Sequence, residues 1–357
     1  MKTTTRKWIQ AVISPIVTVM LAFMVGAVLI VVSGKSPVEA YGALLKGGLA
    51  GTRSIFNTLF SATPIILTGL ATAISFKANI FNMGVEGQLY MGAFAAAYVG
   101  FSFEGLYPIL HVTLCVLAAM AAGGIYALIP GILKGYLNVN EMVSTIMLNY
   151  VAILFTTHLS SFTFKAKGAG FAATELISHS AFLPRFSKIS QLNAAFLLAL
   201  LFVVLTFILM RRVKLGYEIE AIGQNLEFAE AAGMNVAKKT VIIMVISGMI
   251  GGLAGAGEVL GVHHRFISQF SPGYGWDGMT IALLGKNSPF GVLISGLFFG
   301  LLKNGGSTME LMVEVPRSLI NILQGLIIFF LAVELGFSRL GLWKKIRLGK
   351  TGKVEGV

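Results

Sequence analysis

Three carboxylates stand out because they interrupt sequence that is otherwise apolar. Glu86, Glu258 and Asp277 each lie within or beside an apolar, glycine-rich segment. An ionisable side chain is costly in lipid, so a carboxylate there marks an ion or proton site, or holds a broken helix in place. For Glu258 a structural, hydrogen-bonded carboxylate is an equally good interpretation. These carboxylates therefore predict either an ion-binding site or the anchoring of a broken helix.

The segment around Glu86 adds amides to the carboxylate. Its sequence, NIFNMGVEGQLYMGAF, places Asn79, Asn82 and Gln88 at the start of an apolar helix. Lipid exposure of these groups would be unfavourable, so the segment must face protein or a water-filled path. We interpret it as a broken helix beside a translocation route. A polar contact between helices is the alternative.

Motifs for other kinds of chemistry are absent from the sequence. Gly285-Lys286 comes closest to a nucleotide-binding P-loop, but Asn287 follows it and the first glycine is missing. The adjacent His263 and His264 project in different directions and have no third ligand nearby, so no metal site is predicted. No H-E-x-x-H or G-x-S-x-G sequence is present either. We therefore predict no catalytic residue, no cofactor and no enzyme activity.

Composition predicts the environment of the chain. The 357 residues are 56% hydrophobic and 12% charged, and the mean hydropathy is +0.83. These values predict an all-α polytopic membrane protein. The net charge of +12 comes largely from clusters at the two ends and in residues 211–239. Because such clusters are typical of cytoplasmic loops and tails, they do not indicate a nucleic-acid partner.

The apolar segments predict a single transmembrane domain, 1–357, with about ten crossings that include short or broken helices. Two pieces at 277–285 and 290–302 are each too short for a full span. Counting them separately places both basic ends, 1–8 and 339–357, in the cytoplasm and the loop at 163–190 outside. Small residues at four-residue spacing, Gly248, Gly252 and Ala256, predict a helix buried in the bundle. The remaining helices are expected at 9–32, 36–48, 54–75, 108–129, 142–162, 191–210 and 317–335.

Residues 211–239 form a polar segment between two apolar ones, and they carry a short helix. Asn225 is a favourable N-cap, Glu227 places negative charge in the first turn, and Gly233 is the expected residue after the last turn. About two turns are too few for stability in water without docking. We interpret this helix as a docking element for a cytoplasmic partner, with an ordinary connecting loop as the alternative.

Two classes of transporter remain from these residues. One is a secondary transporter driven by ions through its buried carboxylates, and the other is a permease subunit driven by a separate cytoplasmic ATPase. Each half of the chain contains a glycine-rich broken segment with an acidic residue, Glu86 in one and Glu258 or Asp277 in the other. Weak internal similarity of this kind is typical of transporters built from two structural repeats. The docking helix favours the permease subunit.

Three stretches resemble a known family. They are NIFNMGVEGQLYMGAF, AIGQNLEFAEAAGMNVAKK and YGWDGMTIALLGKNSPFGVLISGLFFG. They are similar to permease subunits of bacterial ABC importers for simple sugars, nucleosides and branched-chain amino acids, and most similar to the nucleoside branch that works with a lipoprotein receptor. The resemblance implies a multi-pass protein of the bacterial plasma membrane that imports nucleosides, or alternatively simple sugars, by alternating access.

The resemblance also implies partners. They are a cytoplasmic ABC ATPase, an extracellular substrate-binding lipoprotein and a second, different permease. The family segment that contacts the ATPase corresponds here to the loop bearing Gly223, Asn225, Ala231, Ala232, Gly233 and Val236. Hydrolysis of ATP would belong to the partner subunit.

Overall fold

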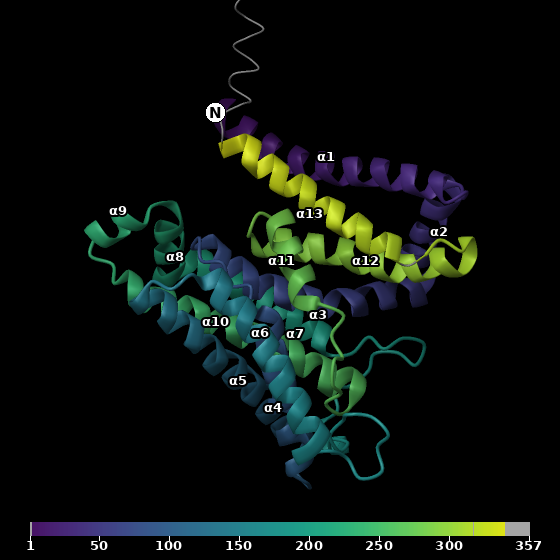
Figure 1. Cartoon of the computed structure of the whole chain (residues 1–357), viewed down its shortest axis with the longest axis vertical. Helices are drawn as coiled ribbons and strands as arrows, with labels where there is room; N and C mark the ends of the chain where they lie inside the picture. The colour runs from purple at the N-terminus through teal and green to yellow at the C-terminus, as the bar shows by residue number, and fades with distance from the viewer. Residues whose placement is uncertain (1, 317, 340–357) are drawn as a thin grey trace, which may run out of the picture. The chain divides into compact units, whose positions relative to one another are not determined.

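In this computed structural model, which describes residues 2–316 and 318–339, the regular structure is helical (Figure 1). The described residues also contain two isolated antiparallel β-bridges, Ala173 with Ile267 and Arg185 with Asn193. The chain divides into a larger unit, Leu45–Gly305, and a smaller one formed by Met1–Leu44 with Gly306–Val357. The basic tail predicted at 339–357 lies, apart from residue 339, outside the described residues.

Apart from α8 (Lys214–Gln224), the helices follow the predicted order. They are α1 (Lys2–Val32), α2 (Pro37–Leu49), α3 (Gly51–Lys77), α4 (Val85–Ser102), α5 (Pro108–Leu137), α6 (Glu141–His158), α7 (Ala195–Arg212), α8 (Lys214–Gln224), α9 (Leu226–Ala231), α10 (Val236–Glu258), α11 (Tyr274–Leu284), α12 (Pro289–Val313) and α13 (Ser318–Arg339). Single π-helical turns, Leu159–Thr163 and Val259–His263, extend α6 and α10, and a 3₁₀ turn covers His179–Ala181.

Five helices among the described residues are long and apolar enough to cross a membrane. They are α3, α5, α7, α6 with its π turn, and α10 with its π turn. The bent pair of Ile16–Val32 and Pro37–Leu49, which meet at 119°, would bring the total to six if it forms one span. The chain is thus an all-helical polytopic membrane protein, and the count of about ten crossings stays a prediction.

The central helix of the larger unit is α10, and its glycines explain why. A Cβ built on Gly252 would overlap the carbonyl oxygen of Ala119 in α5, and one on Gly255 would overlap that of Leu89 in α4. Gly248 approaches Gly123 of α5 in the same way. Backbones this close require residues without side chains, which gain dispersion contacts along the helix. The prediction that this helix is buried is confirmed.

Two predicted elements need correction. The piece expected at 290–302 is part of α12, which continues to Val313 because Lys303 and Asn304 find partners inside the protein. Asn304 Nδ2 donates to the carbonyl oxygens of Gly47 and Ser54, each at 2.9 Å. The polar segment 211–239 was expected to carry one short helix, yet it also contains α8. The break between α11 and α12 is confirmed, and Lys286 and Asn287 there have φ values of 53° and 54°.

The smaller unit has its own contacts. Helix α1 packs against α13, where Gly26 leaves room for the side chain of Leu323. The Tyr41 hydroxyl donates to the carbonyl oxygen of Phe23 at 2.7 Å, and Lys35 forms an exposed ion pair with Glu314 at 3.0 Å. None of the predicted site residues lies in this unit.

Candidate functional site

The connection between α3 and α4 carries a buried amide network. Asn82 Nδ2 donates to Ser247 Oγ of α10 at 2.8 Å and to Gln88 Oε1 of α4 at 3.1 Å. The Ser247 hydroxyl in turn donates to the carbonyl oxygen of Ala71 in α3 at 2.6 Å. Asn82 and Gln88 are each 1% exposed, whereas Asn79 is exposed at a φ of 56°. The network therefore joins three helices at one point and excludes Asn79.

A residue that the sequence analysis missed completes this region. Asn149 of α6 accepts a hydrogen bond from the Gly87 backbone N–H and donates to the Met83 carbonyl oxygen, both at 2.7 Å. The Gly87 N–H lies in the first turn of α4, where a helix leaves N–H groups without intrahelical partners, and Met83 lies just before that turn. The available signal was an amide in the otherwise apolar stretch 142–162.

The two segments predicted as broken helices meet. Glu86 Oε2 accepts the backbone N–H of Gly275 in the first turn of α11 at 2.5 Å. The Ser271 hydroxyl accepts a second N–H of that turn, from Tyr274, at 3.1 Å. A Cβ on Gly275 would press against the Glu86 backbone at 2.6 Å, so only glycine fits. A carboxylate at a helix N-terminus is favoured by the free N–H groups and by the helix dipole.

Asp277, also in the first turn of α11, forms a salt bridge with Lys303 of α12. The side chains are 15% and 18% exposed, and the ammonium lies 5.2 Å from the centre of the Tyr274 ring. Lys303 was missed because it lies just beyond the apolar piece predicted at 290–302. Glu86 and Asp277 are thus brought together by one helical turn.

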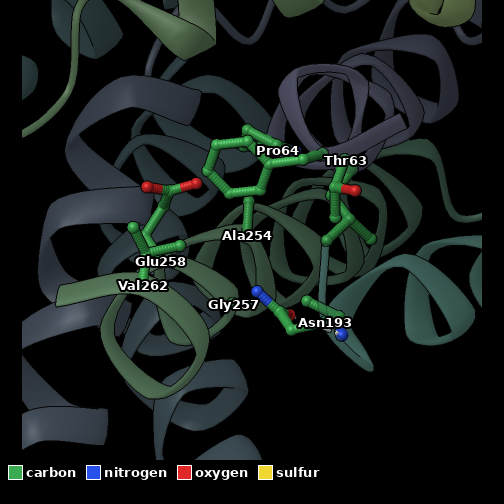
Figure 2. Close-up of a pocket in the computed structure, with 10 residues that line it drawn as sticks. Thr63, Pro64, Asn193, Ala254, Gly257, Glu258 and Val262 are labelled. Atoms are coloured by element: carbon green, nitrogen blue, oxygen red, sulfur yellow. Dashed lines mark hydrogen bonds between the residues drawn. The ribbon is translucent and has the colours of Figure 1, made fainter. Parts of the chain in front are cut away.

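Glu258 lies in the last turn of α10, where its charge interacts with that of Lys303. Its carboxylate is 3.6 Å from His263 Nε2 and lines a small cavity (Figure 2). Thr63 and Pro64 of α3 form another side of this cavity, and Asn193 closes it. The volume, about 10 Å³, is that of about one water molecule. In this conformation the cavity is far too small for an organic substrate.

The short helix α9 has the predicted ends. Asn225 Oδ1 accepts the Phe228 backbone N–H at 3.0 Å, and Gly233 has a φ of +80°. Ala229 is fully buried against Ile222 of α8 and Val236 of α10. The remaining surface of α9 faces outward, and it includes Leu226 and Phe228, which are 48% and 62% exposed. Glu227, Ala231, Ala232 and Gly233 are exposed with them.

Helix α8 attaches α9 to the membrane helices. Glu220 forms an ion pair with Lys77 at the end of α3, at 3.1 Å, and Glu218 forms one with Lys239 of α10 at 2.5 Å. Gly223 lies against the carbonyl oxygen of Lys77. Movement of α9 would therefore be transmitted to α3 and α10, the helices joined by the amide network.

Gly223→Ala is expected to destabilise the chain by about 1–3 kcal/mol, because the new methyl group would overlap the Lys77 carbonyl oxygen and push α8 away from α3. Thermal unfolding of the purified protein in detergent measures the loss. Gly170→Ala is the matched control, since a Cβ there has nothing within 4 Å. Equal stability of the two variants would show that α8 is not held by this contact.

Comparison with known proteins gives the family. The family model described as branched-chain amino acid transport system / permease component matches residues 54–332. The chain belongs to this permease family. All of the predicted coupling and path residues lie within the matched range.

Several named permeases are similar along most of their length. The guanosine ABC transporter permease protein NupP of Bacillus subtilis (strain 168) is 36% identical, over 91% of this chain and 94% of the relative. The glucose ABC transporter permease protein TsgB13 of Haloferax volcanii is 34% identical, over 91% and 88%. The nucleoside ABC transporter permease protein NupB of Lactococcus lactis is 32% identical, over 91% and 92%. No solved structure matches the chain.

Proposed function

We propose that this permease is the transmembrane subunit of an ABC importer for nucleosides. The observation that carries the proposal is its similarity to the guanosine and nucleoside permeases along more than nine-tenths of its length. A permease of this kind works with an ATPase and a substrate-binding protein. Glucose, or another simple sugar, is the second candidate substrate because the Haloferax glucose permease is 34% identical.

Helix α9 is the element that we propose docks on the ATPase. Its support is structural, because exposed Leu226 and Phe228 project from a helix whose buried Ala229 is fixed against α8 and α10. Exposed apolar side chains on a rigid platform are typical of a docking surface. The predicted coupling residues, Gly223 to Gly233, then act mainly through shape: they cap, end and anchor this helix.

The transport route is proposed to pass beside the two meeting helix starts. Glu86 and Asp277 have hydrogen-bonding and ionic partners within the chain, which favours a role in holding α4 and α11 over contact with substrate. Water access to Asn82, Glu86, Gln88 and Asp277 stays a prediction for other states of alternating access, since opening would have to break the amide network that holds Asn82 and Gln88. A second permease subunit, ten crossings and cytoplasmic ends are parts of the same proposal.

The energy source tests the proposal. Uptake of radiolabelled guanosine in cells carrying the full importer is expected to persist when a protonophore collapses the proton gradient while ATP is maintained. It is expected to stop when the ATPase partner is inactivated. Glu86→Gln and Glu258→Gln should leave this independence of the gradient unchanged, because neither carboxylate carries the driving proton. If uptake stops when only the proton gradient is collapsed and ATP is maintained, the chain is a secondary transporter. If glucose competes for uptake and nucleosides do not, the substrate is a sugar.

A further inference from the structure

A second, much larger cavity opens at the end of α3 that follows α2. Its volume is about 500 Å³, within the range of small-molecule sites. Arg53 and Asn57 of α3 line it together with Arg185, Lys188, Ser190 and Gln191 of the loop that precedes α7. We call it the outer cavity. Because α7 separates this loop from α8, the outer cavity and the α8–α9 pair lie on opposite sides of a membrane that α7 crosses.

Positive charge in the outer cavity is uncompensated. Three of its lining residues are cations and none is a carboxylate. Among the side chains that the structure describes, neither Arg53 nor Lys188 has a carboxylate oxygen within 4.0 Å. Like charges that share a cavity repel one another, and an anion between them removes that cost.

Arg185 is held in position without being neutralised. Its Nη2 lies 3.2 Å from Nε2 of His264, whose ring stacks on Phe182 with centroids 3.9 Å apart. Burial, followed by the charge of Arg185, lowers the pKa of His264 below its usual value. The imidazole is therefore neutral at pH 7 and accepts the hydrogen bond, so the guanidinium keeps its full charge and its remaining N–H donors.

The uncharged groups of the outer cavity are also fixed. The Ser190 hydroxyl donates to Asn57 Oδ1 at 2.8 Å, which leaves the amide nitrogen of Asn57 as a further donor. The Ser190 oxygen accepts the backbone N–H of Leu192 at 3.2 Å, so the loop is tied to itself where it borders the cavity. The cavity thus has a wall of fixed donors with one positioned cation, Arg185, and two exposed ones, Arg53 and Lys188. A neutral nucleoside has no group that requires three cations.

We propose that the outer cavity binds a phosphate-bearing anion, either a nucleoside monophosphate or the headgroup of an anionic lipid. Arginine recognises phosphate through paired N–H donors, and the two arginines and the lysine are opposite to it in charge. The proposal goes beyond nucleoside import, because it assigns this chain a separate site for a phosphorylated nucleoside or for an anionic lipid.

Binding of guanosine monophosphate to the purified full chain in nanodiscs of neutral phosphatidylcholine tests the proposal, with guanosine as the uncharged comparison. Guanosine monophosphate should bind saturably and be displaced by inorganic phosphate. Arg53→Gln and Arg185→Gln should each weaken it about tenfold or more, which is about 1.4 kcal/mol or more per lost charged contact. Lys165→Gln is the matched control, an exposed cation of the same loop outside the cavity. Lys188→Gln is a second cavity variant should either arginine variant fold poorly.

A separate experiment tests whether the ligand is a lipid headgroup. If the ligand is a lipid headgroup, the chain recovered from nanodiscs that contain phosphatidylglycerol should carry bound phosphatidylglycerol, and the arginine variants should lose it. This result also supports the proposal. Unchanged binding of both phosphate ligands in folded cavity variants would overturn it. So would weaker docking of the substrate-binding protein with no phosphate binding, because the cations would then serve acidic side chains of that protein. Neither failure contradicts the proposed function, because ATP-driven guanosine uptake by the unaltered chain is measured separately.

Discussion

Phe228→Ala is expected to reduce ATP-driven uptake about tenfold or more while the permease still folds and inserts. The side chain is 62% exposed and has no role in the core, whereas Ala229 beside it holds the helix. Truncation of an aromatic anchor at an interface typically costs about 2 kcal/mol or more, which is about 30-fold in affinity. Uptake of guanosine and ATP hydrolysis by the reconstituted importer should be measured together, because loss of coupling lowers uptake without abolishing hydrolysis.

Tyr217→Ala is the matched control for this prediction. Tyr217 is 64% exposed on α8, so the variant loses a similar aromatic surface from the neighbouring helix. Gly233→Pro adds an independent change, since proline cannot adopt the φ of +80° and removes the N–H that donates to the Glu230 carbonyl oxygen at 2.9 Å. Full uptake in both Phe228→Ala and Gly233→Pro would refute docking through α9. An equal loss in Tyr217→Ala would move the docking surface to α8.

The sequence predicted those features whose causes are local. Asn225 and Gly233 identify the ends of α9 because a cap depends on the residues within one turn. The glycines of α10 indicate a buried helix because small residues at four-residue spacing form a continuous strip along one helix face. Glu86 and Asp277 were recognised as unusual for a similar reason, since each is an acid beside an apolar run.

Features that depend on distant partners could not be predicted. Helix α8 was missed because Gly216, Glu218 and Glu220 interrupt its apolar residues. Its stabilising contacts come from Lys77 and Lys239, which are distant in the sequence. Lys303 looked like the polar end of an apolar piece until the structure placed it beside Asp277. The meeting of Glu86 with α11 joins segments 189 residues apart. Residue types show that a polar group needs a partner, and only the fold shows which one.

Lys303→Met is expected to give the largest loss of stability, about 3–5 kcal/mol, because it leaves the carboxylate of Asp277 largely buried without its cation. The double variant Lys303→Met with Asp277→Asn should recover the part of that loss that comes from Asp277, while Glu86 and Glu258, whose charges also interact with that of Lys303, stay unchanged. Thermal unfolding in detergent, with the yield of inserted protein, measures both.

Lys77→Met provides the comparison for this pair. The ion pair of Lys77 with Glu220 has side chains that are 38% and 46% exposed, so its loss should cost about 1 kcal/mol or less. The loss of stability in Lys303→Met divided by that in Lys77→Met separates the effect of burying an ion pair from the effect of removing a charge. If Lys303→Met and the double variant lose the same stability, then other contacts of Lys303, such as that of its ammonium group with the Tyr274 ring, and not compensation of Asp277, hold α11 against α12. Recovery in the double variant would instead show that a charge pair fixes this broken helix, as expected for a carboxylate that anchors structure and leaves substrate contact to other groups.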